Sequence, residues 1–272
     1  MRILFLGDIV GRAGRDAVVE RVPTLRRTLK LDFVIANGEN AAGGYGITEK
    51  ITADLYGCGV DCVTLGNHAW DQRPALSFIE RDPRLIRPAN FPAGTPGRGA
   101  QVFALADGRR ILVVNLMGRI HMDPLDCPFQ TIDRELSRHG LARTAQAILV
   151  DFHAEATSEK MAMGHHLDGR VSAVLGSHTH VPTADHHLLA GGTAYMTDAG
   201  MCADYDSVIG MRKDWATQKF LKRLPTEKKL EPADGPGTIA GALVVTDDRS
   251  GLATAIAPLR QGGRLAEVMP SV

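Results

Sequence analysis

Two histidines, His178 and His180, stand two residues apart just after the apolar run from Val171 to Leu175. The run has the composition of a buried β-strand, so the histidines lie where the backbone leaves a sheet. Residues two apart on extended backbone point to the same side, and imidazole nitrogens are common metal ligands. Taken alone, the pair is as readily explained by two polar side chains on a surface turn.

The ends of four other predicted strands carry polar side chains of the same kind. These side chains are Asp8, Glu39 with Asn40, Asn67 with His68, and His153. Each group alone is weak evidence, because polar residues are common in solvated turns. In an open α/β sheet, however, ligands bind outside the carboxyl ends of the strands. Five such ends at one edge therefore predict a single cleft that contains carboxylates, carboxamides and imidazoles.

A ligand set of this kind is sufficient for two cations that share a carboxylate. Mixed nitrogen and oxygen ligands favour Mn, Fe, Zn or Co over calcium. Two cations ~3.5–4 Å apart generate a hydroxide nucleophile at neutral pH and neutralise the oxygens of a phosphoryl group during displacement. A histidine outside the ligand set could donate the proton that the leaving oxygen requires. The pattern therefore indicates hydrolysis of a phosphoric ester.

The elements that must position these residues alternate along the chain. The predicted strands are 3–6, 32–36, 60–65, 147–150 and 171–175, and the predicted helices are 15–22, 48–57, about 132–145 and 155–163. Two antiparallel hairpins are predicted from 101–105 with 111–116 and from 238–246 with 251–257. Alternating strands and helices favour an α/β fold in which helices cover both faces of a sheet.

Length and composition limit the classes of protein. The 272 residues, 44% hydrophobic and 23% charged, predict one large globular domain, 1–272. The formal net charge is zero, so no general field would attract nucleic acid or an anionic membrane. Four cysteines without a Cys-x-x-Cys motif indicate reduced thiols in a cytoplasm. No run approaches the ~20 apolar residues that a membrane helix requires.

One segment departs from the αβ alternation. Residues 211–230 contain seven Lys or Arg against two Asp or Glu. This composition predicts a basic excursion from the core at about 201–235. We expect either a solvated helix or an arm. Such an arm would cover the cleft or hold a second subunit of a homo-oligomer.

Other histidines are predicted not to be ligands. His121 lies in an irregular polar segment and is interpreted as a surface residue. His165 with His166, and His186 with His187, are adjacent pairs, and neighbouring side chains on extended backbone face opposite ways.

The motifs at the strand ends resemble, in order and spacing, those of the calcineurin-like metallophosphoesterases. They are Gly7-Asp8, Gly38-Glu39-Asn40, Gly66-Asn67-His68, His153 and Gly176-Ser177-His178-Thr179-His180. The segments 7–11 and 36–48 are similar to the YmdB-like branch in particular, and the resemblance covers essentially the whole chain. It implies a metallophosphoesterase-type four-layer αββα sandwich, with a metal cleft at the carboxyl ends of the strands.

The resemblance also implies a role for each motif residue. One metal would be held by Asp8, Glu39, Asn40 and His180. Glu39 would bridge to a second metal, completed by Asn67, His153 and His178. His68 would donate a proton to the leaving group or stabilise the charge on the phosphate.

Two departures from the wider superfamily bear on the metal. Asp8-Ile9-Val10 lacks the usual Asp-x-His, and Glu39 stands where Asp is usual. Both departures match the YmdB-like branch, and Asn40 could supply the missing ligand. Fewer imidazoles and more oxygen favour Fe or Mn over Zn, with Mg also possible.

The implied activity is a phosphodiesterase acting on cyclic nucleotides of the 2′,3′-cyclic AMP class through a metal-activated hydroxide. The substrate would be a small phosphodiester. Two alternatives stay open. The first is a broad phosphomonoesterase or nuclease, although the neutral net charge argues against a stable complex with long nucleic acid. The second is a non-catalytic protein linked to nucleotide or RNA regulation, against which the intact Asn67-His68 pair argues.

Overall fold

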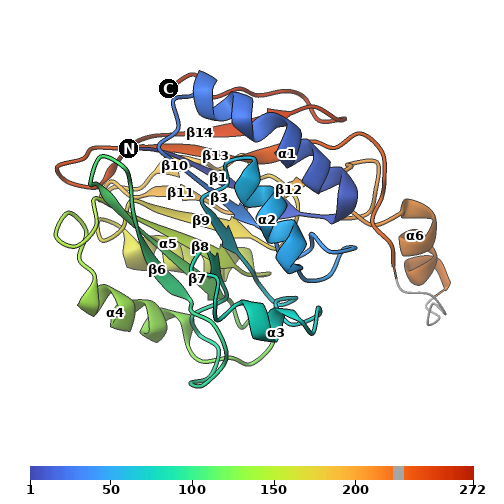
Figure 1. Cartoon of the computed structure of the whole chain (residues 1–272), viewed down its shortest axis with the longest axis horizontal. Helices are drawn as coiled ribbons and strands as arrows, with labels where there is room; N and C mark the ends of the chain where they lie inside the picture. The colour runs from blue at the N-terminus through green and yellow to red at the C-terminus, as the bar shows by residue number, and fades with distance from the viewer. Residues whose placement is uncertain (223–229) are drawn as a thin grey trace.

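Two mixed sheets packed face to face lie at the centre of the structure (Figure 1). The computed structural model describes residues 1–222 and 230–272, and within these it contains two six-stranded sheets and one two-stranded sheet. The first sheet has the order β14 (Ala253–Gln261), β13 (Ile239–Thr246), β1 (Arg2–Leu6), β3 (Phe33–Asn37), β4 (Cys62–Thr64) and β5 (Leu85–Ile86). Strands β1, β3, β4 and β5 are parallel, and β13 is antiparallel to both of its neighbours.

The second sheet follows the same plan. Its order is β10 (His187–Leu188), β11 (Ala194–Met196), β9 (Ala173–Ser177), β8 (Ala147–His153), β7 (Arg110–Met117) and β6 (Ala100–Ala104). Strands β7, β8, β9 and β11 are parallel, whereas β6 and β10 pair antiparallel at the edges. Both predicted hairpins, β6–β7 and β13–β14, are confirmed.

Helices cover the two outer faces. The helices are α1 (Gly11–Thr28), α2 (Glu49–Gly57), α3 (Ala75–Phe78), α4 (Pro128–Arg138), α5 (Thr157–Leu167) and α6 (Lys213–Lys222). Figure 1 shows α1 and α2 over β1 and β3, with α4 and α5 on the far side of the second sheet. The predicted four-layer αββα sandwich is therefore confirmed.

Alternation along the strands explains the layers. On β1, Ile3 and Phe5 face the second sheet and pack in one apolar cluster with Val113 and Leu149. The intervening Leu4 faces the helices on the other side. Successive side chains on a strand point to opposite faces, so a strand buried on both faces is apolar at every position. This is why the predicted strands are continuous runs of apolar residues rather than alternating apolar and polar residues.

The predicted helices exist, but their ends differ. Helix α1 starts at Gly11 and continues to Thr28, past the predicted end at residue 22 and through Pro23. Helix α4 starts at Pro128 and ends at Arg138, whereas the sequence predicts about 132–145. Proline suits the first turn because its missing N–H would have no partner there. Beyond α4 the backbone turns through Ala142, at φ 60°, toward β8.

The predicted basic excursion begins next to the strand that contains Asp8. Strand β12 (Met201–Cys202) pairs with β2 (Asp8–Ile9), and Val10 packs with Met201 and Met211 in a small apolar cluster. Helix α6 stands at the margin of the molecule in Figure 1. Residues 223–229 of the excursion lie outside the described residues. The division into a single domain with an excursion at about 201–235 stays a prediction.

Among the described residues, none of the helices combines the length and the apolarity needed to cross a membrane.

Candidate metal centre

All the predicted ligands come from strand ends at one edge of the sandwich. Asp8 follows β1, Glu39 and Asn40 follow β3, Asn67 follows β4, His153 ends β8, and His178 and His180 follow β9. Parallel strands present their carboxyl ends at the same edge, which places residues distant in sequence in one cleft. Asp8, Glu39, Asn40, His153 and His180 are buried, and Asn67 and His178 are partly buried.

Three of these side chains converge on one ring nitrogen of a fourth, His153. The Nε2 atom of His153 lies 3.1 Å from Glu39 Oε1, 3.0 Å from Asn67 Oδ1 and 3.1 Å from His178 Nδ1. A ring nitrogen carries at most one proton, so it cannot satisfy three acceptors at once. The ligand atoms of Glu39, His153 and His178 all lie within 4.8 Å of one another. This arrangement is typical of atoms that share a cation.

Two buried oxygens beside this cluster have no hydrogen-bond donor within the described part of the chain. They are Asp8 Oδ1 and Asn40 Oδ1. The Asn40 amide donates to Gly44 O at 3.1 Å, which fixes the direction of its oxygen. A buried acceptor without a partner costs about 1–3 kcal/mol. Because a cation would satisfy both oxygens, the donor set fits the metals that the resemblance implies.

His180 is oriented by the excursion. Its Nδ1 donates to the carbonyl of Ile209 at 2.8 Å, and its Nε2 lies 4.0 Å from Asp8 Oδ1. The hydrogen bond to Ile209 fixes the tautomer and leaves the lone pair of Nε2 on the side of Asp8. The predicted grouping of Asp8 with His180 is therefore geometrically possible.

Charge interactions match the requirements of a cation site. Burial disfavours the ionised form of Glu39, but His153 outweighs it and lowers the pKa of Glu39 to about 2. Burial likewise opposes protonation of His153, yet Glu39 and Asp8 raise the pKa of His153 to about 9. Burial lowers the pKa of His178 to about 3, and the charge on His153 adds to this. Carboxylates that hold a proton on His153 would equally attract a cation in its place.

The loop carrying the two histidines is strained and tightly held. His178 has φ 99° and His180 has φ 67°. Such backbone costs about 1–3 kcal/mol per residue and persists where the surroundings determine it. Asp198 accepts hydrogen bonds from the backbone and hydroxyl of Thr179 and pairs with the buried Lys160 at 2.7 Å. Lys160 and Asp198 were missed by sequence reasoning, since nothing in their spacing links them to the loop.

Position 66, just before Asn67, has no room for a side chain. A Cβ atom there would lie 2.3 Å from the His153 ring and 2.4 Å from Glu39 Oε2. Only glycine lets the backbone approach the ligands this closely.

His68 lies at the margin of the ligand cluster. Its backbone N–H donates to Glu39 Oε2 at 3.0 Å, while its ring contacts Asp71 through Nδ1 at 3.0 Å and meets the ring edge of Tyr45. The ring is held by a carboxylate rather than by the ligands. This placement supports the predicted proton donor, a role that stays a prediction. Asp71 was missed, although its position three residues after His68 in a turn is a usable signal.

Two of the histidines predicted as non-ligands have their contacts elsewhere. His166 pairs with Asp133 at 3.0 Å, and His187 contacts the carbonyl of Asp185 at 2.6 Å. Neither approaches the ligand cluster through any contact among the described residues.

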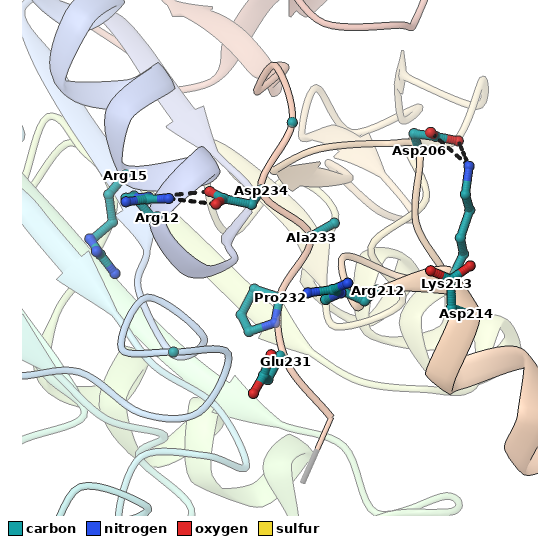
Figure 2. A pocket seen from close by; sticks show the side chains of 12 residues that line it. Arg12, Arg15, Asp206, Arg212, Lys213, Asp214, Glu231, Pro232, Ala233 and Asp234 are labelled. Carbon is teal, nitrogen blue, oxygen red and sulfur yellow. Dashed lines mark hydrogen bonds and ion pairs between the residues drawn. The ribbon is translucent and has the colours of Figure 1, made fainter. Parts of the chain in front are cut away.

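A cavity apart from the ligand cluster, here called the charged cavity, lies between the start of α1 and residues 231–235 (Figure 2). Its volume is about 480 Å³, and none of the residues that line it is a predicted ligand. Figure 2 shows Arg12 paired with Asp234 and Lys213 paired with Asp206. The cavity meets the turn after Asn40 through Gly43.

Comparison with known proteins supports the resemblance seen in the sequence. A family model described as YmdB-like protein matches residues 4–259. A Bacillus subtilis (strain 168) protein named 2′,3′-cyclic-nucleotide 2′-phosphodiesterase is 49% identical over 250 residues, which are 92% of this chain and 93% of that protein.

Two solved structures share the architecture. A hypothetical protein from Thermus thermophilus has a TM-score of 0.90 at 43% identity, covering 97% of this chain and 100% of that one. A structure described as a novel phosphatase, from Mycoplasma pneumoniae, has a TM-score of 0.89 at 31% identity, covering 96% and 93%. The range matched by the family model, residues 4–259, includes every predicted ligand.

Proposed function

The chain belongs to the YmdB-like family, and from this premise we propose that it is a metal-dependent phosphodiesterase of 2′,3′-cyclic nucleotides. The observation that carries the proposal is the convergence of Glu39, Asn67 and His178 on His153 Nε2. The two buried oxygens without donors in the described part of the chain lie beside it. The Bacillus subtilis relative, named for this activity, supports the substrate class.

Two sets of residues would hold the cations. One consists of Asp8, Glu39, Asn40 and His180, and the other of Glu39, Asn67, His153 and His178. Oxygen-rich ligand sets favour Fe or Mn, with Zn and Mg as alternatives. Bound there, the two cations would activate water as a nucleophile and neutralise charge on the phosphate oxygens.

Side chains around the ligands would orient the bridging acid and supply the proton for the leaving group. The His68 N–H holds Glu39 Oε2, so the acid presents its other oxygen toward His153. Asp71 accepts from Nδ1 of the His68 ring. With the Nδ1 proton held by Asp71, the imidazolium form of His68 carries its second proton on Nε2, and this is the proton that would be given to the ribose oxygen as it leaves, which returns the ring to its neutral form. The neutral net charge agrees with a small phosphodiester rather than long nucleic acid as substrate.

Elemental analysis of the purified protein with a hydrolysis panel tests the proposal. The panel contains 2′,3′-cyclic AMP, p-nitrophenyl phosphate and bis(p-nitrophenyl) phosphate. We expect close to two metals per chain, hydrolysis of the cyclic nucleotide well above the monoester, loss with a chelator, and recovery with Mn²⁺ or Fe²⁺. Full activity in metal-free protein, or activity confined to the monoester, would refute it.

A further inference from the structure

We propose that Ser177 and Asp151 are positioning residues that fix the orientation and tautomer of His153, so that its Nε2 faces the cations. The inference rests on the proposed function, because it concerns how the chain prepares a ligand for the metals. Neither residue is among the predicted ligands.

Three buried groups form a chain of hydrogen bonds. His153 Nδ1 lies 2.9 Å from Ser177 Oγ, and the Ser177 hydroxyl donates to Asp151 Oδ1 at 2.6 Å. The relative exposure of all three side chains is 0%. A hydroxyl has one proton, so once Ser177 gives it to Asp151 its oxygen is only an acceptor, both for His153 Nδ1 at 2.9 Å and for Asn37 Nδ2 at 3.4 Å. The proton of neutral His153 is thereby placed on Nδ1, and the lone pair is left on Nε2.

Asp151 is held as an acceptor. Its other oxygen, Oδ2, accepts from Thr64 Oγ1 at 2.5 Å and from Asn37 Nδ2 at 3.2 Å. Both oxygens of Asp151 therefore face donors, so Asp151 is an acceptor. The Ser177 hydroxyl must then point its proton toward Oδ1. Asn37 also accepts the N–H of Glu39 at 3.1 Å, so the same network reaches the bridging acid.

The sheet register builds this chain of groups. Asp151 and His153 are two residues apart on β8, so their side chains share a face of the sheet. On the neighbouring β9, Ser177 is the register partner of His153. The serine therefore stands beside the ring because of strand pairing. Partners that orient a ligating histidine through its second nitrogen typically contribute 10–100-fold to metal affinity.

The test measures Mn²⁺ affinity by competition with a chelator, in the purified full-length protein. Ser177→Ala should weaken the affinity by about 10–100-fold. Ser177→Thr keeps the hydroxyl and should recover most of the loss. Asp151→Asn tests the other end of the chain of hydrogen bonds and should also weaken binding, because asparagine offers one acceptor oxygen where Asp151 offers two to the donors of Ser177, Thr64 and Asn37. Circular dichroism and thermal melts show whether each variant is folded.

Ser172 provides a matched control. It is equally buried, and its hydroxyl donates to Gly251 O at 2.5 Å and accepts from Ile148 N at 3.0 Å, away from the cleft. Ser172→Ala loses a buried hydroxyl of the same kind and should bind Mn²⁺ like the wild type.

A spectroscopic readout separates positioning from general stability. In Zn²⁺-loaded protein, the ¹⁵N shifts of the His153 ring should place the proton on Nδ1 in the wild type and in Ser177→Thr. Wild-type affinity in folded Ser177→Ala, or an equal loss in Ser172→Ala, would overturn the positioning role alone. A wild-type protein without metal affinity would overturn the proposed function and this inference together.

Discussion

The ligand cluster and the charged cavity differ in how their polar groups are satisfied. In the cluster, acids and imidazoles are mostly buried, acceptors crowd around His153 Nε2, and oxygens of Asp8 and Asn40 lack donors among the described residues. In the charged cavity, opposite charges pair off at the surface, as with Arg12 and Asp234, whose side chains are 65% and 60% exposed. The number of charged residues is thus a poor indicator of a binding site. Buried polar groups without a hydrogen-bond partner in the chain are a better indicator.

The physical reason lies in solvation. Burying an acceptor without a donor is unfavourable, so two such oxygens beside one cluster of acids and imidazoles point to something else that binds them. Exposed ion pairs, in contrast, lose little when separated, because water solvates both partners. The comparison therefore predicts large effects for substitutions in the cluster and small ones in the charged cavity.

The largest effect is expected for Glu39→Gln. The change removes the one carboxylate that both proposed sites share, while the side-chain volume stays almost constant. Cation catalysis is worth several kcal/mol, so turnover of 2′,3′-cyclic AMP should fall by roughly 10⁴-fold. Metal content, measured by elemental analysis, should fall with it. Full metal content with normal turnover would exclude the bridging role.

A smaller loss is expected for His68→Ala. General acid assistance contributes about 10²–10⁴-fold, and metal content should not change. The loss should be greater for a ribose leaving group than for p-nitrophenolate, which departs without a proton. His178→Ala, by contrast, should reduce metal content and slow both substrates together.

His166 is a suitable control for His68. Each ring is partly exposed and lies 3.0 Å from a carboxylate, Asp133 for His166 and Asp71 for His68. His166→Ala should leave both rates unchanged. If His68→Ala empties a metal site, His68 is a ligand. If it slows both substrates equally with the metals intact, it stabilises charge on the phosphate instead.

The sequence was sufficient to predict the polar residues at the strand ends. It was not sufficient to predict the residues that hydrogen-bond to them. Continuous apolar runs predict the strands and the polar residues after them, because a strand buried on both faces has a distinctive composition. Ser177 and Asp151 could not be paired in the same way, since their contact depends on the register of β8 against β9. Nor could the extent of α4, which depends on where the chain turns back to the second sheet.

A third prediction concerns α6, which borders the charged cavity through Lys213 and Asp214. Phe220 and Leu221 on this helix are 72% and 73% exposed. If the excursion holds a second subunit, changing both to Ser should lower the molecular mass measured by light scattering, with metal content unchanged. Met161→Ser, on the exposed side of α5, is the control. An unchanged mass would leave the solvated-helix interpretation.

The smallest effect is expected for Arg12→Ala, which directly tests the charged cavity. Arg12 contacts Asp234 at the surface, and its loss should change neither metal content nor kcat nor KM. Arg15, one turn further along α1, donates instead to the carbonyl of Ala41, next to Asn40. Arg15→Ala should therefore weaken metal binding slightly, through the turn that orients the Asn40 oxygen. Titration with Mn²⁺ and steady-state kinetics of both variants distinguish the two arginines. A raised KM for 2′,3′-cyclic AMP in Arg12→Ala, with metal content intact, would mean that the charged cavity binds substrate, and the contrast between the ligand cluster and the charged cavity would fail.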